Sequence, residues 1–330
     1  MELQFGTPFQ GKELKRTVDF LRRSGLNYED GIEFTVNAVE DGETLATGSR
    51  QGNVLKCIAV SPESRGTGLT AVVITNLVRN AVLQGITHLF LYTRPFNKKI
   101  FGDLGFYPVA ETHEVLLMEN KKNGVKNFVN RLECPVKTGI IGCIVANANP
   151  FTNGHLYLAR IAAGSCDLVH LFILSEDRSL FPADVRLMLA KQAVASLPNV
   201  VVHPTGDYLI SGATFPAYFI RDKSKVEEIC GELDLAVFLQ QFAKPLHITR
   251  RFVGSEPFSP VTESYNRAMK RILPEGGVQV TMLPRVKWNG KEVSASRVRQ
   301  LLRDGNLEAV KPLVPEPTYR YLKGRNRDAN

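Results

Sequence analysis

Residues 139–155 read GIIGCIVANANPFTNGH, an apolar run that breaks abruptly into asparagine, proline, glycine and histidine. A run this apolar and this rich in β-branched residues is typical of a strand buried on both faces of a parallel sheet. The polar break must therefore lie where the strand leaves the core. Parallel sheets bind ligands beyond the carboxyl ends of their strands, so the break is the first place to look for a functional site.

The same alternation continues downstream. Strands are predicted at 139–146, 168–174 and 200–204, with helices at about 154–164 and 182–197 between them. Alternating strands and helices of this length predict a doubly wound, Rossmann-like parallel sheet.

A second α/β region precedes this one. VLKCIAV (54–60) and ITHLFLYT (86–93) resemble strands on either side of a helix that Gly85 closes, which makes a βαβ unit. Polar and basic residues from about 119 to 137 separate the two regions. We therefore predict two domains, 1–133 and 134–330.

The composition is that of a globular protein. The chain has 330 residues, of which 44% are hydrophobic, enough for two cores. No apolar run reaches the roughly 18 residues of a membrane span and the N-terminus lacks a signal peptide's apolar core, so a cytoplasmic protein without membrane contact is expected. Its five cysteines and six histidines show no metal-ligand spacing, so any metal ion should arrive with a substrate. A net charge of +8 favours anionic partners, but without interleaved aromatics nucleic acid is not expected among them.

The string PFTNGH has the features of a phosphate-binding turn. Pro150 and Gly154 shape a tight strand-to-helix turn, and Thr152 and Asn153 can cap the helix. The helix N-terminus offers amide donors and the positive end of its dipole, and the imidazole of His155 in the first turn can face the same anion. A capped helix with an ordinary histidine explains so short a motif about as well.

A second helix start of this kind occurs late in the chain. VKWNGKEVSASRVR (286–299) contains an Asn-Gly turn and then Ser294, Ser296, Arg297 and Arg299 at the start of an amphipathic helix. Ser294 can cap that helix, and Arg299 lies where it could reach an anion held at the first turn. Ser294 alone is more simply an N-cap, but two such helix starts in one domain are harder to explain in this way.

TxGH after the first strand, paired with a late SxSxxR, resembles the nucleotidylyltransferase superfamily of α/β proteins. The resemblance implies that His155 and Thr152 stabilise charge at the α-phosphorus of ATP, and that Ser294, Ser296 and Arg299 hold the departing pyrophosphate. It also assigns to the ATP site the remaining motif residues Asn149, Pro150, Phe151, Gly154 and Arg297. Many members have Phe-Asp-Pro where this chain has Ala148-Asn149-Pro150, so no role for the aspartate carries over.

Longer strings are more specific. IVANANPFTNGH, EDRSLFPADVR, GDYLISGATFPAYF, RFVGSEPFSPVTESYN and VSASRVR together resemble the citrate lyase ligase family. The resemblance implies that acetate and MgATP form an acetyl-adenylate. The acetyl group then passes to the thiol of a phosphoribosyl-dephospho-CoA group on the acyl carrier subunit of citrate lyase, and AMP is released.

Three further residues are candidates for the nucleotide site. Glu256, in GSEP, is expected to contact ATP unless it merely caps the next helix. Arg178 and Arg186 flank a Phe-Pro pair and could approach the nucleotide, although solvated helix arginines are the commoner case.

In the first domain, SPESRGTGL places Arg65, Gly66, Thr67 and Gly68 between a strand and a helix, where glycines let backbone amides approach a pyrophosphate. Together with PFNKKIFGDLGFYPV (95–109), this loop resembles the GNAT acetyltransferase fold. That resemblance implies a mixed sheet and a loop that binds the pyrophosphate of coenzyme A.

Two positions depart from the GNAT pattern. Thr70 stands where a small residue is usual, and Phe101 stands where many members carry a catalytic tyrosine, although phenylalanine cannot donate a proton. We therefore expect this domain to dock a CoA-like arm rather than to transfer an acyl group. A degenerate domain kept for stability is the alternative.

Two other functions fit parts of the pattern. One is a nucleotidyltransferase that leaves AMP on a cofactor precursor. The other is a non-enzymatic nucleotide sensor, which the paired phosphate motifs disfavour because a sensor needs no separate grip on a leaving group.

Overall fold

The computed structural model describes residues 1–176, 179–209, 215–220, 222–255 and 260–328. Contacts within the chain divide it into two compact units. The N-terminal unit is Met1–Lys126 with Ser211–Ala236, and the C-terminal unit is Asn127–Ile210 with Val237–Asn330. The predicted boundary at 133/134 lies a few residues after the first break. The return of residues 211–236 to the N-terminal unit is a feature that the sequence did not suggest.

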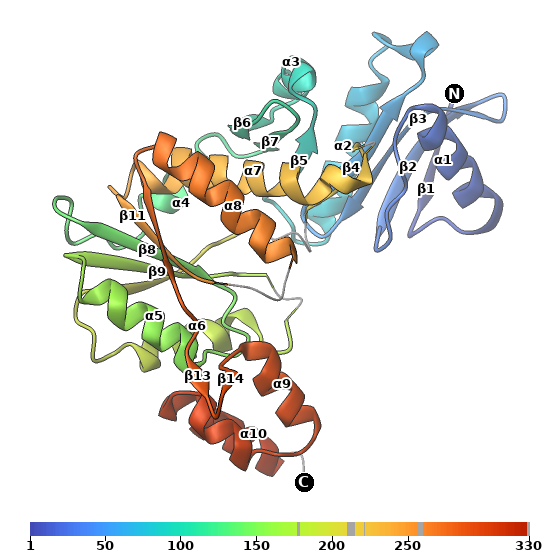
Figure 1. Ribbon diagram of the computed structural model, residues 1–330. Helices are drawn as coiled ribbons and strands as arrows, with labels where there is room; N and C mark the ends of the chain where they lie inside the picture. The colour runs from blue at the N-terminus through green and yellow to red at the C-terminus, as the bar shows by residue number, and fades with distance from the viewer. Residues whose placement is uncertain (177–178, 210–214, 221, 256–259, 329–330) are drawn as a thin grey trace. The chain divides into compact units, whose positions relative to one another are not determined.

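The N-terminal unit is built on a seven-stranded mixed sheet (Figure 1). The strand order is β1-β2-β3-β4-β5-β7-β6, in which only β4 and β5 are parallel neighbours. The strands are β1 (Glu2–Gly6), β2 (Phe34–Glu40), β3 (Glu43–Gln51), β4 (Val54–Val60), β5 (Phe90–Thr93), β6 (Tyr107–Glu111) and β7 (Leu116–Glu119). The helices are α1 (Gly11–Arg23), α2 (Leu69–Leu83) and α3 (Lys98–Gly102), with the short turns η1 (Pro62–Ser64) and η2 (Pro95–Asn97). The returning segment adds η3 (Lys223–Lys225) and most of α7 (Val226–Val237), while α4 (Gly124–Val129) spans the first break.

The predicted βαβ unit is present as β4, α2 and β5. Helix α2 buries one face against the sheet, with Val73 and Leu77 completely buried. The strand predicted from residue 86 begins only at Phe90, because the amide of Ile86 donates to the carbonyl of Ala81 and so closes α2. Strands β4 and β5 pair only where both begin, and their later residues no longer bond to each other.

The C-terminal unit is a five-stranded parallel sheet in the order β10-β9-β8-β11-β12. The strands are β8 (Ile141–Ala146), β9 (Leu168–Ile173), β10 (Val200–Pro204), β11 (Arg250–Gly254) and β12 (Gln279–Leu283). Helices α5 (Asn153–Ala163) and α6 (Ala183–Ala193) lie on one face, and α8 (Pro260–Glu275) lies on the other (Figure 1). The π-helical turn η4 (Phe238–Ala243) continues from α7. After the sheet come the hairpin β13 (Lys287–Trp288) and β14 (Lys291–Glu292), then α9 (Ala295–Arg303), η5 (Glu308–Leu313) and α10 (Glu316–Asp328).

This arrangement confirms the predicted α/β class, with a mixed sheet followed by a doubly wound parallel sheet. The chain order runs outward from β8 in both directions, so the topological switch point lies between β8 and β11. Helix α6 ends at Ala193, earlier than predicted: its C-cap residue Val194 has already left helical backbone, with φ −101° and ψ 8°. No helix in the described ranges has both the length and the apolar character needed to cross a lipid bilayer.

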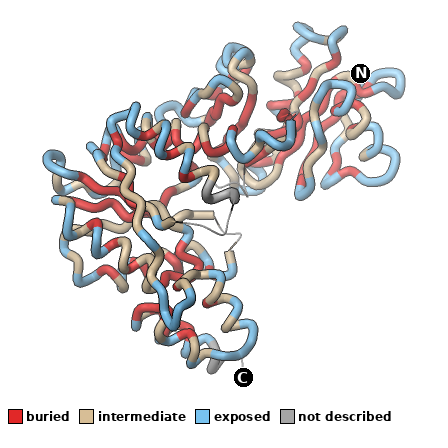
Figure 2. Tube along the Cα trace, viewed as in Figure 1, coloured by how far each residue is buried: buried red, intermediate tan, exposed pale blue. Residues whose placement is uncertain are grey.

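The cores of the two units are separate clusters (Figure 2 shows the buried positions along the trace). In the C-terminal unit the buried cluster lies between the sheet and helices α5 and α6, with Phe151 and Leu171 completely buried. This core therefore supports the loop that follows β8.

Candidate active site

The loop after β8 stands at the topological switch point of the parallel sheet. Ala148 adopts a φ of 51° and is almost completely buried, a left-handed conformation that is uncommon for alanine and that surrounding packing must hold. The peptide bond between Asn149 and Pro150 is cis. The side-chain oxygen of Asn149 accepts a hydrogen bond from the amide of Phe181 at 3.2 Å. The packing around Ala148 and the bond from Phe181 to Asn149 therefore hold the loop in place.

His155 is bonded back to the first turn of α5. Thr152 is the N-cap, and its amide donates to Nδ1 of His155 at 2.9 Å, as in a capping box with histidine in place of the usual glutamate or glutamine. The ring also lies 5.2 Å from that of Phe151, centroid to centroid. Because Phe151 is completely buried, any contact that it makes with a ligand is through its backbone.

The imidazole of His155 is a neutral hydrogen-bond donor at neutral pH. Burial, with the positive charge of Arg285 adding to it, lowers the pKa of His155 to about 4. Since Nδ1 accepts from an amide, the ring proton resides on Nε2. The donor is therefore fixed in identity and direction without the ring carrying a charge.

The SxSxxR motif of residues 294–299 contacts the loop after β8 directly. Nη1 of Arg299, on α9, donates to the carbonyl oxygen of Asn149 at 2.7 Å. The ideal Cβ position on Gly154 lies 3.2 Å from the carbonyl oxygen of Val293, so a larger residue there would crowd the approach. Nδ2 of Asn153 donates to the carbonyl of Pro312 at 2.9 Å. The structure thus brings together two motifs that are about 140 residues apart.

The start of α9 is capped as predicted. Oγ of Ser294 accepts from the amide of Arg297 at 3.2 Å and lies 3.0 Å from Oγ of Ser296. Nη1 of Arg297 donates to the carbonyl oxygens of Lys291 and Glu292, both at 3.2 Å, so it braces the hairpin before the helix. Burial and the nearby Arg303 lower the pKa of Arg299, so this guanidinium would gain from an anionic ligand.

Arg186 is a candidate residue whose environment differs from the solvated helix position that is commoner for arginine. It is completely buried rather than a solvated helix arginine. Its guanidinium donates to the carbonyl oxygens of Leu174 at 2.7 Å, Asn147 at 2.8 Å and Phe181 at 2.9 Å, and to that of Glu176. It therefore ties the ends of β8 and β9 to the start of α6. Arg178 and Glu256, the other two weaker candidates, lie outside the described residues.

Arg285 was missed by the sequence analysis. It follows β12 at the same carboxyl edge of the sheet, its Nε donates to the carbonyl oxygen of Ser255 at 2.8 Å, and its charge acts on His155. Glu292 lies 3.7 Å from the same nitrogen. The position of Arg285 after β12 was the available signal in the sequence, but that strand had not been predicted.

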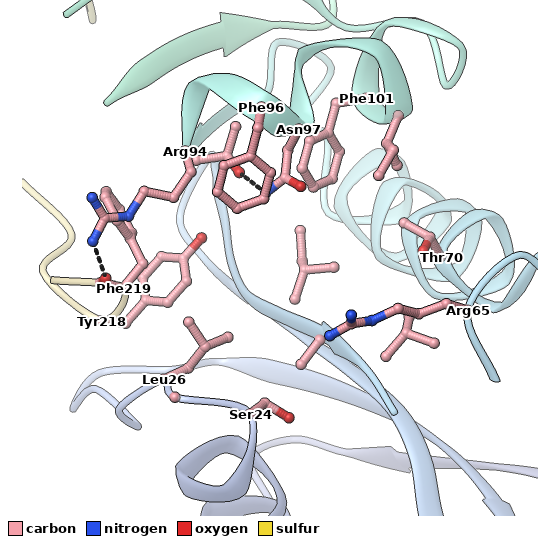
Figure 3. Close-up of a pocket in the computed structure, with 16 residues that line it drawn as sticks. Ser24, Leu26, Arg65, Thr70, Arg94, Phe96, Asn97, Phe101, Tyr218 and Phe219 are labelled. Carbon is pink, nitrogen blue, oxygen red and sulfur yellow. Dashed lines mark hydrogen bonds between the residues drawn. The ribbon is translucent and has the colours of Figure 1, made fainter. Parts of the chain in front are cut away.

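The N-terminal unit contains a cleft of about 740 Å³ (Figure 3). It lies where β4 and β5 have stopped pairing, and α2 and α3 contribute to its walls. Of the predicted loop residues, Arg65 lines the cleft, whereas Gly66, Thr67 and Gly68 are exposed in the turn before α2. Phe101, in the position expected for a tyrosine, also lines it.

No group of three or more potential metal ligands from His, Cys, Asp and Glu gathers anywhere in the described part of the chain. The same residues include five free cysteines. The groups described above at the end of β8 are amides, hydroxyls, one neutral imidazole and guanidinium groups, with the carboxylate of Glu292 beside Arg285.

Comparison with known proteins places these features in a family. A family model described as the citrate lyase ligase C-terminal domain matches residues 141–322. The [citrate [pro-3S]-lyase] ligase of Klebsiella pneumoniae is 40% identical over 318 residues, covering 94% of this chain and 93% of the relative. The enzyme of the same name from Escherichia coli is 39% identical over 321 residues, covering 95% and 91%.

Two solved structures are each similar to part of this chain. An acyl-CoA N-acyltransferase from Pseudomonas aeruginosa is similar over 36% of this chain and 99% of its own, with 18% identity and a TM-score of 0.33. A bifunctional NMN adenylyltransferase/ADP ribose pyrophosphatase from Francisella tularensis is similar over 57% of this chain and 49% of its own, with 20% identity and a TM-score of 0.36.

Proposed function

Since this chain belongs to the citrate lyase ligase family, which uses ATP and acetate to acetylate the carrier thiol of citrate lyase, we propose that its C-terminal unit makes an acetyl-adenylate at the end of β8. Family membership over nearly the whole chain sets aside the two alternatives, a transferase that leaves AMP on its product and a non-enzymatic sensor.

The observation that carries this proposal is the bond between Arg299 and the carbonyl of Asn149. It joins α9 to the loop that precedes α5, and the N-terminus of each of these helices offers amide donors and a positive dipole end to an anion. One helix start can serve the α-phosphate through His155 and Thr152. The other can serve the β- and γ-phosphates through Ser294, Ser296 and Arg299, so a triphosphate would span the two.

The first step needs alignment rather than a general base. The acetate carboxylate is already ionised at neutral pH, so its oxygen can attack the α-phosphorus directly. A bond forms from that oxygen to phosphorus, and the bond to the bridging oxygen breaks to release pyrophosphate. Nε2 of His155 donates a hydrogen bond to an α-phosphate oxygen as negative charge develops there. Arg299 stabilises the negative charge of the departing pyrophosphate.

We propose that Mg²⁺ enters as part of the MgATP substrate. The residues that face the triphosphate are donors and cations, which suit phosphate oxygens rather than a metal ion. The protein's share of the chemistry is therefore to hold the phosphates and to supply hydrogen bonds where charge develops.

The second step uses the carrier thiol. Its sulfur attacks the acetyl carbonyl carbon, a carbon–sulfur bond forms, the bond to the adenylate oxygen breaks, and AMP leaves while the thiol proton passes to solvent. We propose that the phosphoribosyl-dephospho-CoA arm of the acyl carrier docks in the cleft of the N-terminal unit, with Arg65 and the loop of Gly66, Thr67 and Gly68 at its pyrophosphate. Because ATP and a free thiol are both required, we place the reaction in the cytoplasm.

Acetate-dependent exchange of labelled pyrophosphate into ATP tests adenylate formation. Replacing His155 by alanine should lower the exchange rate by roughly 10²- to 10³-fold, the usual effect of losing one donor to developing charge. His113→Ala is the matched control, since that side chain is 97% exposed on the N-terminal unit. An unchanged rate in His155→Ala would remove the assignment, and exchange without acetate would remove the acetyl-adenylate.

A further inference from the structure

Asn147 is the first residue after β8, at the carboxyl end of the parallel sheet and next to its switch point. It is exposed, although the two residues that follow it, Ala148 and Asn149, are at least nine-tenths buried. An exposed polar side chain at this edge lies where parallel sheets bind ligands. The groups assigned so far to adenylate formation all serve phosphates, and acetate has none.

The carboxamide of Asn147 has a fixed orientation. Nη1 of Arg186 lies 2.8 Å from Oδ1 of Asn147, and Oγ of Ser179 donates to the same oxygen at 3.2 Å. A guanidinium group carries only donors, so the carboxamide atom that faces it must be the oxygen. If the carboxamide turned over, its NH2 group would stand against the donor of a completely buried arginine. The NH2 group of Asn147 therefore faces away from Arg186 and Ser179.

This NH2 group is a donor that the fold does not use. Within the described ranges of the chain it has no hydrogen-bond acceptor of its own. The rest of the loop is held on two sides, because the side-chain oxygen of Asn149 accepts from the amide of Phe181 and its carbonyl accepts from Arg299. Nδ2 of Asn147 is thus presented from a rigid support, so a ligand that binds it pays little to order it.

The chemistry of the first step favours acetate as the ligand of this donor. A carboxylate has two oxygens, and a donor that holds one of them leaves the other free to attack the α-phosphorus in a fixed direction. A cation in the same place would stabilise the free carboxylate more strongly, and stabilisation of the reactant alone does not accelerate the reaction. A neutral carboxamide therefore suits the alignment of an anionic nucleophile.

We propose that Nδ2 of Asn147 binds a carboxylate oxygen of acetate and aligns the other oxygen for attack on the α-phosphorus. This inference rests on the proposed formation of an acetyl-adenylate at the end of β8. It makes Asn147 a substrate-binding residue at the start of the loop whose far end carries Thr152 and His155.

Asn147→Asp separates the donor from the structural contacts. Aspartate has nearly the same shape and still accepts from Arg186 and Ser179, so this variant should melt at or above the wild-type temperature. It cannot donate, and its charge repels acetate. In acetate-dependent pyrophosphate exchange, the acetate concentration for half-maximal rate should rise roughly tenfold or more, the usual effect of losing one hydrogen bond to a charged group.

Asn147→Ala removes the donor without adding a charge. It should also raise the half-maximal acetate concentration by roughly tenfold, while the half-maximal ATP concentration stays within about twofold of the wild-type value. Thermal unfolding of both variants shows that the proteins compared are folded.

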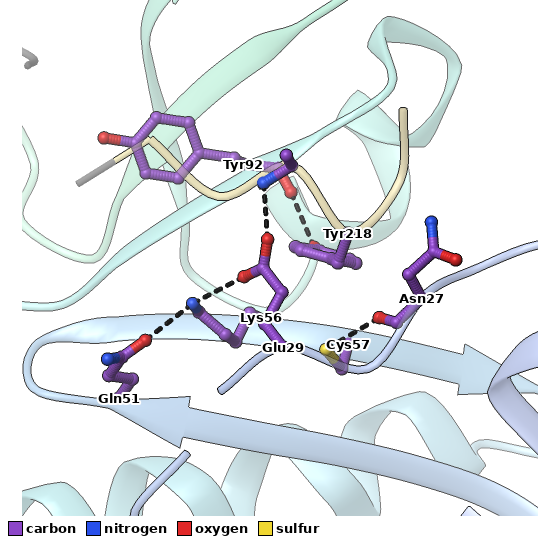
Figure 4. Close-up of polar contacts among 8 residues, drawn as sticks. Asn27, Glu29, Gln51, Lys56, Cys57, Tyr92 and Tyr218 are labelled. Carbon is purple, nitrogen blue, oxygen red and sulfur yellow. Dashed lines mark hydrogen bonds and ion pairs between the residues drawn. The ribbon is translucent and has the colours of Figure 1, made fainter. Parts of the chain in front are cut away.

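Two exposed asparagines outside the site provide matched controls for the change to aspartate. Oδ1 of Asn306, which follows α9, accepts from the amide of Ala309 and would still do so in Asn306→Asp. In the N-terminal unit, the backbone carbonyl of Asn27 accepts from Sγ of Cys57 at 3.6 Å, and the carboxamide points away from this contact (Figure 4). Neither Asn306→Asp nor Asn27→Asp should change the half-maximal acetate concentration by more than about twofold.

The outcomes separate this inference from the proposed function. A wild-type acetate requirement in Asn147→Asp or Asn147→Ala would overturn the donor role and leave Asn147 as a support for Arg186 alone. In Asn147→Ala, a rise in the ATP requirement as large as the rise for acetate would mean that the donor serves a phosphate, which also overturns the assignment to acetate. A wild type whose exchange needs no acetate would instead remove the acetyl-adenylate. If Asn147→Asp fails to fold, Asn147→Ala decides the matter by the same criteria.

Discussion

At the scale of single residues, His155 combines two tasks on opposite sides of one ring. Nδ1 caps α5 by accepting from the amide of Thr152, and this contact leaves the proton on Nε2. Burial and Arg285 keep the ring neutral by lowering its pKa to about 4. A neutral donor does not bind a phosphate as strongly as an imidazolium would, which favours catalysis by stabilising charge only as it develops.

A glutamine at position 155 separates these two tasks. Glutamine is a natural capping-box residue, so His155→Gln should retain the cap and melt within a few degrees of the wild type, while His155→Ala loses about 1 kcal/mol of stability. Exchange activity should fall strongly in both, because the amide cannot reproduce the position of Nε2. Thermal unfolding and pyrophosphate exchange measured on both variants check this.

The pH dependence of the exchange rate tests whether His155 acts as a neutral donor. A group whose pKa is lowered to about 4 stays neutral from pH 5.5 to 8, so the ratio of wild-type to His155→Gln exchange rates should be constant over that range. A ratio with an inflection near pH 6.5 would mean that the imidazole titrates at its ordinary pKa, and the neutral-donor role would be wrong.

At the scale of elements, Arg186 fastens α6 to the ends of two parallel strands. Its planar guanidinium reaches four carbonyl oxygens in different directions, from Asn147, Leu174, Glu176 and Phe181. A single ammonium cannot match this geometry even though it carries the same charge. Nη1 of Arg186 also donates to Oδ1 of Asn147 at 2.8 Å, so the loop at the switch point depends on this buried arginine.

Arg186→Lys should accordingly be a severe change. The buried carbonyl of Phe181 and three partly buried carbonyls would lose their donor, so we expect a loss of about 3 kcal/mol or more in the free energy of unfolding and a comparable drop in exchange activity. Arg160→Lys on the exposed face of α5 is the matched control and should change neither by a measurable amount. Denaturant titration together with the exchange assay decides the matter; wild-type values in Arg186→Lys would contradict the fastening role.

At the scale of the whole molecule, secondary structure that depends on neighbouring residues was predictable from the sequence. Contacts between residues far apart in the chain were not. The strand, turn and helix of residues 139–155 follow from adjacent residues, as does the cap made by Ser294. The burial of Arg186 and the charge that Arg285 directs at His155 depend on strands that meet only in the fold. Residues 215–220 carry no local sign that they complete a cleft built from residues before 102.

Because the chain forms two units, a substitution in the N-terminal unit should affect docking of the carrier arm without affecting adenylate formation in the C-terminal unit. Arg65 is exposed at the rim of the N-terminal cleft, so Arg65→Glu replaces attraction for a pyrophosphate by repulsion. Losing one charge-assisted contact is worth about 1.5–3 kcal/mol, so the apparent KM for the acyl carrier should rise by roughly tenfold or more. Adenylate formation should stay within about twofold of the wild-type rate, because we assign that step to the C-terminal unit, whereas Arg65 belongs to the N-terminal unit. Lys12→Glu makes the same change of charge on an exposed residue of α1 outside the cleft and should alter neither quantity.

Loss of both activities in Arg65→Glu, or of neither, would contradict docking of the arm at this rim. Steady-state kinetics with the carrier and pyrophosphate exchange without it measure the two quantities independently.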